Sequence, residues 1–581
     1  METGEREEAL AAMRSGHQVE INALEFIEAI IQLSEESSEV NYFKKLAFMA
    51  TSSPVLSGLM PEFEAKVRGL RKEPIHEILF KLREKLDRGD YKAVLDIVCS
   101  DKCFHKEPAV QRILAAASLK TGAFDLAVDA SLRVLEVEPE SHYDRIRLGD
   151  AFAAEAKQEA IQAYTSVAES GQPQLQMEAA ARLVEYYDLT GDRERALTWS
   201  DITNQHLKAI SNSAGQHNPS NLGNTKTVQE KLRVGHFINE RALLEHADIL
   251  EALVRFYDRE RYELIIYQQY DIRHPLTSVL RVQVDCWLES HQINDATLSH
   301  IIANDEVHLI VDWCGLFSGH RQAVLATKPA RLNLGFLGLM PERLGSVMDG
   351  QISFEAGGAK CFHMDVPGTY GLSSQSSTQA HRISSSLKDK GRITFGSGCD
   401  LARLIASAEG WSRVLNAVPD SIIVLGDIEN VSDNIRDKVR EVFAKFGLAE
   451  RCFIIDAGLR ELSRAHMLAH TDILLDYACH GDSHLILEAL QSRIPVISYE
   501  CECGGTRRTN SILTTMGLEG WLAMNEDEFV EIALNLSSPG PNLSDARQRL
   551  TGIVNHSRLA DPKNCIKSME RAIQDAWQSV S

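Results

Sequence analysis

The chain has 581 residues, and its 61 Lys and Arg against 82 Asp and Glu give a formal net charge of −21. Hydrophobic residues make up 44% and charged residues 25%, which is the balance of an ordinary globular protein. This length predicts about three to five domains, and the acidic sum argues against binding nucleic acid or an anionic membrane through bulk charge.

Three features of the sequence indicate the cellular compartment of the protein. No apolar run approaches the ~20 residues that span a bilayer, so we expect no membrane insertion. The first eight residues are acidic and contain no apolar core of a signal peptide. The 11 cysteines are scattered and odd in number, which favours reduced thiols over a disulfide framework. We therefore expect a cytoplasmic protein.

The first third of the chain is predicted to be helical. Gly89 and Gly122 lie 33 residues apart, and Gly191 follows 69 residues later, close to two periods of the ~34-residue tetratricopeptide repeat. We interpret residues 1–207 as a helical region, with tetratricopeptide-like repeats over about 75–205. A non-repetitive helical bundle is the alternative. Because such arrays present a concave surface to a peptide or protein, they predict a protein partner.

From about residue 231, predicted strands alternate with helices, which indicates parallel sheets. Ligands of such sheets bind at the carboxyl ends of the strands. The sequence contains no Gly-x-Gly-x-x-Gly fingerprint and no phosphate-loop lysine motif. The predicted divisions are a linker over 208–230, a first Rossmann-like half over 231–370, a Ser-rich connection over 371–390, a second Rossmann-like half over 391–535 and a C-terminal helical segment over 536–581.

The most informative segment is Asp472–Ile497, which reads as a strand, a small-residue turn, a helix and another strand. A helix N-terminus offers free N–H groups and a positive dipole end to a diphosphate, and Ser483 and His484 can add donors there. Glu488 lies one turn further along and can accept hydrogen bonds from two ribose hydroxyls. A capped helix with a solvent-facing glutamate is the alternative.

This segment resembles the nucleotide-sugar half of GT-B glycosyltransferases, most closely the O-GlcNAc transferase/SPINDLY family. Ser483 and His484 fall where that family has His-Thr, and Glu488 falls on its acidic residue. The family also places tetratricopeptide repeats before its GT-B region. The resemblance implies an α plus α/β fold, in which an N-terminal helical solenoid precedes a GT-B pair of Rossmann-like domains, and a nucleotide sugar bound in the second half.

Other residues extend the resemblance. Arg403 falls on a family lysine that faces the diphosphate, where arginine keeps the charge and can bind phosphate through two nitrogens. A surface-helix arginine is the alternative. Arg507 lies in a segment similar to the family's Ser-Arg-x-x-x-Ser-x-Leu, and Arg464 completes the candidate nucleotide-sugar-binding residues. Arg321 and Lys328 match two family arginines in the first half.

The first half departs from the family. Two family histidines fall at Leu244 and Asp248 in the gapless register, and His246 lies between them. An inverting transfer needs a base or proton shuttle near the attacking hydroxyl. The candidates are Asp312, Glu240, His246 and Asp248; the first two lie on or just after predicted strand ends. A helix-face histidine is the alternative for His246.

Two further signals are discounted. Cys501 and Cys503, with Cys479 and the histidine after it, could be drawn as a zinc site, but their spacing fits no common zinc finger. The resemblance implies transfer without a metal, so no metal and no cofactor other than the donor are expected. His320 is either a donor or acceptor contact or an ordinary loop histidine.

The prediction is a cytoplasmic protein glycosyltransferase, inverting and metal-independent. It transfers a sugar from a nucleotide sugar, a UDP-sugar by analogy, to Ser or Thr of a protein held by the helical repeats. One alternative is a bacterial flagellin glycosyltransferase that uses a nonulosonic acid from a CMP-linked donor. Another is a non-catalytic scaffold with a relic GT-B domain, motivated by the missing histidines. A transferase for small-molecule or lipid-linked glycans leaves the repeats without a purpose.

Overall fold

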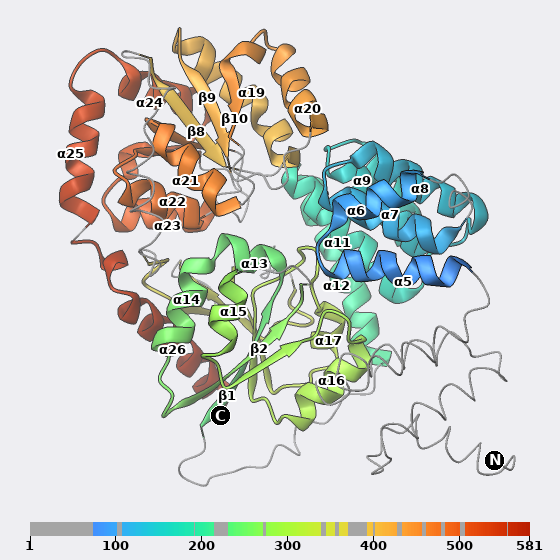
Figure 1. The fold of residues 1–581 in the computed structure, drawn as a ribbon. Helices are drawn as coiled ribbons and strands as arrows, with labels where there is room; N and C mark the ends of the chain where they lie inside the picture. Colours follow the sequence, from blue (N-terminus) through green and yellow to red (C-terminus); the bar gives the residue numbers. More distant parts are fainter. Residues whose placement is uncertain are drawn as a thin grey trace, which may run out of the picture. The chain divides into compact units, whose positions relative to one another are not determined.

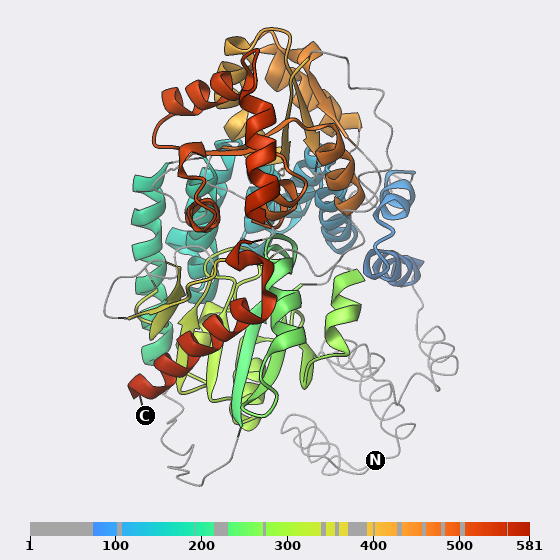
Figure 2. The same cartoon turned by 90° about the vertical axis from the view of Figure 1, so that its left-hand side faces the viewer.

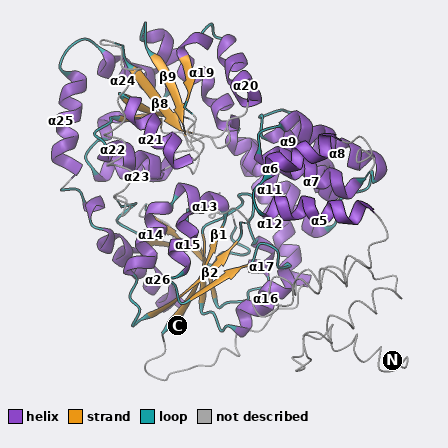
Figure 3. Cartoon of the chain, viewed as in Figure 1, coloured by secondary structure: helices purple, strands orange, loops and turns teal. Residues whose placement is uncertain are grey.

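The structure is a computed structural model that describes residues 74–100, 107–190, 192–213, 231–270, 275–337, 344–354, 360–369, 392–398, 401–426, 433–455, 460–477, 483–499, 506–554 and 556–580. The chain divides into two compact units, Met1–Glu84 and Lys85–Ser581. The described part of the smaller unit begins with helix α5 (Pro74–Asp87). All the strands of the described residues belong to the larger unit (Figure 3).

Successive helices of the larger unit pack against one another before the first sheet (Figure 1). They are α6 (Tyr91–Ser100), α7 (Pro108–Lys120), α8 (Phe124–Val137), α9 (His142–Ala153), α10 (Glu159–Ser170), α11 (Pro173–Leu189) and α12 (Arg193–Ser213). Each helix contacts the next, and α9 also contacts α7 and α11, which is the neighbour pattern of a solenoid. This pattern confirms the predicted N-terminal helical solenoid.

Small residues explain this close packing. Gly122 has a φ of 69° in the turn between α7 and α8, a conformation that glycine adopts without strain. A Cβ atom at Gly149 of α9 would lie 2.4 Å from the ring of Tyr164 on α10. Pro108 and Pro173 begin α7 and α11, where a missing N–H costs nothing. Gly191 lies outside the described residues.

The first Rossmann-like half is a parallel sheet whose strands run in the order β3-β2-β1-β4-β5-β6-β7. The strands are β1 (Leu232–Ile238), β2 (Tyr262–Gln268), β3 (Cys286–Glu289), β4 (Leu309–Asp312), β5 (Leu332–Gly335), β6 (Gly350–Ser353) and β7 (Cys361–His363). The helices of this half are α13 (Glu240–Glu245), α14 (Ala247–Phe256), α15 (Pro275–Arg281), α16 (Asp295–Asn304) and α17 (Gln322–Ala326). The central strand β4 is buried throughout, as expected for a parallel sheet covered on both faces.

The second half repeats this plan with the parallel strand order β10-β9-β8-β11-β12-β13. The strands are β8 (Thr394–Gly398), β9 (Ile422–Gly426), β10 (Cys452–Ile454), β11 (Ile473–Asp476), β12 (Val496–Tyr499) and β13 (Leu522–Ala523). The helices of this half are α19 (Leu401–Ala417), α20 (Asp433–Ala444), α21 (Arg460–His470), α22 (Ser483–Gln491), α23 (Thr506–Thr515), α24 (Glu526–Ser537) and α25 (Asn542–Val554), and the chain continues into α26 (Pro562–Val580). Both sheets thus have the 3-2-1-4-5-6 order of doubly wound folds, which confirms the two predicted Rossmann-like halves.

The last two helices belong to different halves (Figure 2). Helix α25 contacts α22 and α24 of the second half, and Arg547 pairs with Asp472 at 2.6 Å. Helix α26 contacts α14, β6 and β7 of the first half, where the backbone N–H of Asp258 donates to Glu570 at 2.7 Å. The chain therefore crosses back to the first half at its end. Among the described helices, none combines the length and the apolar character that a membrane crossing requires.

The helical region contacts both halves. Asn204 of α12 accepts a hydrogen bond from the backbone N–H of Ser346 at 3.2 Å in the first half. Lys438 of α20, in the second half, lies 3.5 Å from Glu155, which follows α9. The solenoid is thus attached to both sheet domains rather than to one.

Candidate functional site

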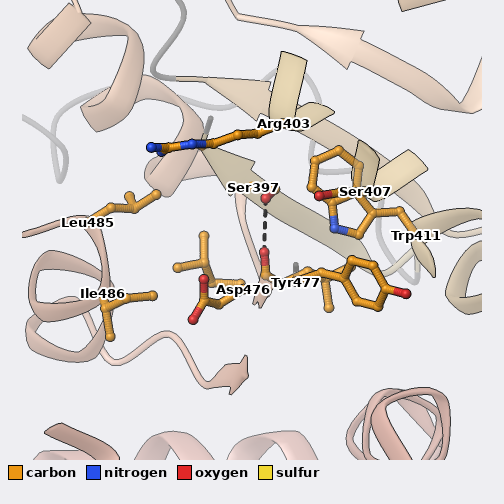
Figure 4. A pocket seen from close by; sticks show the side chains of 11 residues that line it. Ser397, Arg403, Ser407, Trp411, Asp476, Tyr477, Leu485 and Ile486 are labelled. Atoms are coloured by element: carbon orange, nitrogen blue, oxygen red, sulfur yellow. Dashed lines mark hydrogen bonds between the residues drawn. The ribbon is translucent and has the colours of Figure 1, made fainter. Parts of the chain in front are cut away.

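A pocket lies in the second half between α19, the ends of β8 and β11, and α22 (Figure 4). Strands β8 and β11 are neighbours, and the strand order reverses between them. Open α/β sheets bind their ligands at this switch point, outside the carboxyl ends of the strands. The pocket therefore occupies the position at which this fold binds a ligand.

Polar groups line the pocket. Ser397, at the end of β8, donates its hydroxyl to the carbonyl of Leu475 at 2.9 Å. Trp411 is buried, and its indole Nε1 has no hydrogen-bond partner among the described residues. A buried N–H group without an acceptor destabilises the folded protein by about 1–3 kcal/mol. An acceptor atom of a ligand or a water molecule would remove this cost by accepting a hydrogen bond from the indole.

Tyr477 fixes one wall of the pocket. Its ring stacks on Tyr499 with the centroids 5.4 Å apart, and its hydroxyl donates to Glu526 at 2.5 Å. Gly410 of α19 lies directly against this ring, because a Cβ atom there would be 2.2 Å from Tyr477. The glycine thus lets α19 approach the end of β11 closely.

Arg403 of α19 lines the pocket and is 4% exposed. In Figure 4 its guanidinium is directed toward the side of Leu485 on α22, and Trp411 lies on the other side. Its Nη2 donates to Glu245 of α13 in the first half at 2.7 Å. The residue predicted to face a diphosphate therefore lies in the pocket and already carries a carboxylate partner.

The start of α22 places three predicted donor-binding residues together. Ser483 begins the helix, is buried, and has a hydroxyl without a hydrogen-bond partner among the described residues. Glu488 lies between an imidazole and a guanidinium: His484 Nε2 is 3.5 Å from its Oε1, and Arg464 Nη1 of α21 is 3.9 Å from its Oε2. The helix start thus offers a free hydroxyl beside a charged cluster.

The first half approaches this cluster through α14. Burial raises the pKa of Glu251, against the opposing charges of Arg255 and His484. Glu251 therefore lies within electrostatic range of His484, across the boundary between the halves.

Two of the candidate bases, His246 and Asp248, bind one arginine of the second half. Arg508 of α23 donates Nη1 to His246 Nδ1 at 2.8 Å, Nη2 to Asp248 Oδ2 at 2.6 Å, and Nε to the carbonyl of Pro367 at 2.6 Å. All three side chains are buried. Burial and the charge of Arg508 hold the pKa of His246 well below its usual range, so the imidazole is neutral.

Asp312 and Glu240 lie elsewhere. Asp312 ends β4 and accepts hydrogen bonds from the backbone N–H groups of Cys314 and Gly315 and from the amide of Gln322 at 2.6 Å. Burial raises its pKa, although these hydrogen bonds oppose the shift. Glu240 begins α13 and pairs with Lys120 of α7 at 2.9 Å. The first residue thus closes the turn after β4, and the second joins the first half to the helical region.

The first-half residues matched to the family have structural partners. Arg321 donates to Gln269, Asp295 and the carbonyl of Ser290, each at 2.8 Å, and so braces the loops after β2 and β3. Lys328 pairs with Asp349 at 2.9 Å. His320 lies 3.2 Å from Glu178 of α11, at the boundary with the helical region.

Some predicted residues cannot be placed in the site. Arg507 lies in α23, but its side chain is outside the described residues. The discounted zinc arrangement of Cys479, Cys501 and Cys503 also lies outside them.

The sequence analysis missed Arg508 and Glu245. Arg508 follows the predicted Arg507, and the helical periodicity of α23 alone does not show that Arg508 is buried. Glu245 precedes His246, but its partner Arg403 lies 158 residues away. Arg508 could have been found from its place next to Arg507, which lies in the family-like segment. No feature of the sequence singles out Glu245.

The fold and the site define the class of protein: a helical solenoid before a GT-B pair of Rossmann-like domains. Solved structures include the same arrangement. The structure matches a point mutant of the O-GlcNAc transferase of Thermobaculum terrenum with a TM-score of 0.70 and 18% identity, over 87% of this chain and 98% of that one. At this identity the match establishes the fold.

Sequence comparison confirms the predicted resemblance to the O-GlcNAc transferase/SPINDLY family. Residues 401–569 match the model of glycosyl transferase family 41. The chain is 24% identical over 371 residues to the probable UDP-N-acetylglucosamine–peptide N-acetylglucosaminyltransferase SPINDLY of Solanum lycopersicum, and 22% identical over 371 residues to that of Arabidopsis thaliana. Each match covers 61% of this chain and 40% of the relative, so the chain spans about two fifths of the length of these curated relatives.

Proposed function

We propose that the protein is a glycosyltransferase that transfers a sugar from a UDP-sugar to Ser or Thr of a protein acceptor, with inversion and without a metal. The observation that carries the proposal is the pocket at the switch point of the second sheet, lined by Arg403 and bordered by the start of α22. The likeness of residues 401–569 to glycosyl transferase family 41 covers these elements and supports it.

The donor half has the groups that the leaving diphosphate requires. The negative charge that develops when the sugar leaves is stabilised by a buried guanidinium and by the N–H groups of a helix start. Arg403 supplies the first, and Ser483 adds its unpartnered hydroxyl to the second. Glu488, beside His484 and Arg464, provides the acceptor oxygens proposed for the ribose hydroxyls.

An inverting transfer also requires a base or proton shuttle near the acceptor hydroxyl. Among the described residues, His246 and Asp248 bind Arg508, Asp312 closes a turn, and Glu240 pairs with Lys120. Each candidate base therefore has a structural partner.

The acceptor side of the proposal rests on the helical region. A solenoid attached to both sheet domains can hold a protein segment so that its hydroxyl faces the donor. We propose that the acceptor is a cytoplasmic protein bound by these helices.

Calorimetric titration tests the donor site. The full chain is titrated with UDP, CMP and GDP, and then with the matching nucleotide sugars. We expect UDP to bind most tightly and Arg403→Ala to weaken that binding about 20-fold or more, because a charged hydrogen bond to phosphate is lost.

The other outcomes distinguish the alternatives. Preferential binding of CMP contradicts a UDP donor and favours a nonulosonic acid donor, for which the mass of flagellin from a deletion strain is the next test. No binding by any nucleotide contradicts the donor site and favours the scaffold.

A further inference from the structure

The arginine of the donor pocket already binds an anion. Arg403 Nη2 lies 2.7 Å from Glu245 Oε1, and the two side chains are only 5% and 12% exposed. Water and salt screen such a pair less than they screen a surface pair. A diphosphate in the pocket therefore meets a guanidinium that already has a carboxylate partner.

Glu245 retains a second cation when Arg403 leaves it. The same Oε1 accepts a hydrogen bond from Arg241 Nε at 3.0 Å. Because Arg241 remains as a counter-ion, a change of partner by Arg403 does not leave Glu245 as a buried unpaired charge.

Arg241 is itself fixed in place. Its Nη1 donates to Glu185 of α11 at 3.2 Å, and its guanidinium lies over the ring of Phe317, 3.8 Å from the centroid. Glu185 also accepts a hydrogen bond from the backbone N–H of Ser318 at 3.1 Å. A row of four charges, Arg403, Glu245, Arg241 and Glu185, thus runs from the pocket through the first half to the helical region.

We propose that Glu245 is a placeholder anion for the donor pocket. It pairs with Arg403 in the empty site, and the diphosphate of the donor displaces it, after which Glu245 stays with Arg241. Glu245 is therefore a positioning residue that orients Arg403 and lowers the affinity of the pocket for diphosphate. The inference rests on the proposed donor site and deepens it.

The test is calorimetric titration of the full chain and of Glu245→Gln with UDP, pyrophosphate and uridine. Glutamine keeps the size and one acceptor oxygen of Glu245 but removes the competing charge. We expect UDP and pyrophosphate to bind roughly tenfold more tightly to the variant, a coupling of ordinary size for neighbouring charged groups. Uridine carries no phosphate, so its affinity should not change.

Glu263→Gln is the matched control. Glu263 pairs with Arg233 at 3.0 Å beside the beginning of β2, at the opposite end of the strands from the ligand edge of the sheet. This substitution makes the same change in net charge but leaves Arg403 and Glu245 untouched, so UDP affinity should stay as in the unsubstituted chain. Equal tightening in both variants assigns the effect to net charge and overturns the inference.

Unchanged or weaker binding of both anions to Glu245→Gln also overturns the inference. If circular dichroism shows that this variant does not fold, Glu245→Asp replaces it. Its carboxylate is withdrawn by one methylene from the 2.7 Å contact with Arg403, and we expect pyrophosphate affinity to rise about twofold or more. No rise in the folded Asp variant contradicts the exchange.

The same titrations separate the two proposals. If pyrophosphate binds, and binds more tightly to Glu245→Gln than to the unsubstituted chain, while UDP does not bind, the result contradicts the UDP donor and supports the exchange. If UDP binds both proteins with the same affinity, the result contradicts the exchange but not the donor site. Failure of both anions to bind either protein contradicts both proposals.

Discussion

A single buried histidine shows how the environment of a side chain sets its chemistry. His236 lies in β1, and its Nδ1 accepts a hydrogen bond from the indole of Trp313 at 2.9 Å. Burial lowers the pKa of His236 to about 3, against roughly 6.5 for an unperturbed histidine. The imidazole therefore acts in the folded protein as a neutral hydrogen-bond acceptor.

The pKa shift makes stability depend on pH. Below about pH 6.5 the unfolded chain binds a proton at this histidine, whereas the folded chain does so only near pH 3. The contribution of His236 is thus complete above pH 6.5 and is lost as the pH falls through this window. His246, whose pKa is also lowered by burial, acts in the same direction.

We predict that His236→Asn weakens this dependence. The Asn side-chain oxygen can replace Nδ1 as acceptor for Trp313, but it does not ionise. Between pH 6 and 4.5, the free energy of unfolding should fall less steeply in the variant, by about 1.4 kcal/mol per pH unit. Urea titrations at several pH values measure the slope.

His556→Asn is the control, because His556 is exposed. In His556→Asn, the free energy of unfolding should change with pH as it does in the unsubstituted protein. Equal slopes for His236→Asn and the unsubstituted protein contradict the assignment of a buried neutral imidazole.

Helix α19 illustrates how an element builds the pocket. It carries Arg403 and Trp411, and it can lie against Tyr477 only because residue 410 is glycine. The helix therefore places a cation and an indole N–H on the same pocket through one close approach.

We predict that Gly410→Ala disrupts this approach. A Cβ atom 2.2 Å from the ring of Tyr477 forces the helix or the ring to move, at a cost of about 1–3 kcal/mol. Thermal unfolding measures the loss, and nucleotide affinity should fall with it because Tyr477 lines the pocket.

Gly552→Ala provides the comparison for this prediction. A Cβ atom at Gly552 of α25 meets nothing within 4 Å, and alanine is the better helix former by about 1 kcal/mol at most. This variant should be at least as stable as the unsubstituted chain. Equal stability of the two alanine variants contradicts the packing account of α19.

The periodicity of helices and strands was enough to predict the elements near the pocket. The segment Asp472–Ile497 resembles the O-GlcNAc transferase/SPINDLY family, and this resemblance placed Ser483, His484 and Glu488 at one helix start. In the structure the three residues lie together at the start of α22. This placement agrees with the structure because the three residues share one short helix, whose geometry is local, whereas their role in binding a nucleotide sugar stays a prediction.

Contacts between distant segments could not be predicted in this way. The sequence analysis named His246 and Asp248 as candidate bases, which stays a prediction, but it did not predict their partner Arg508, about 260 residues further along the chain. The contact between Glu245 and Arg403 also joins segments that are distant in the sequence, 158 residues apart. A single sequence shows which residues can ionise but not which tertiary partner neutralises them.

At the scale of the whole larger unit, charged contacts join its three parts. Arg508 connects the second half to the first through three hydrogen bonds, and a Cβ atom at Gly368 would lie 3.0 Å from this guanidinium. The row from Arg403 to Glu185 connects the second half, the first half and the helical region. In the proposed exchange, a diphosphate in the pocket takes Arg403 from Glu245 and so changes a contact in the row that joins all three parts.

The crystal structure of the full chain with UDP at saturating concentration tests the central claim most directly. The account predicts the diphosphate between Arg403 and the start of α22, within hydrogen-bond distance of both, and the guanidinium no longer bound to Glu245. UDP bound away from these residues, or no UDP in the crystal, contradicts the donor site. UDP in the pocket beside an intact Arg403–Glu245 pair contradicts the exchange.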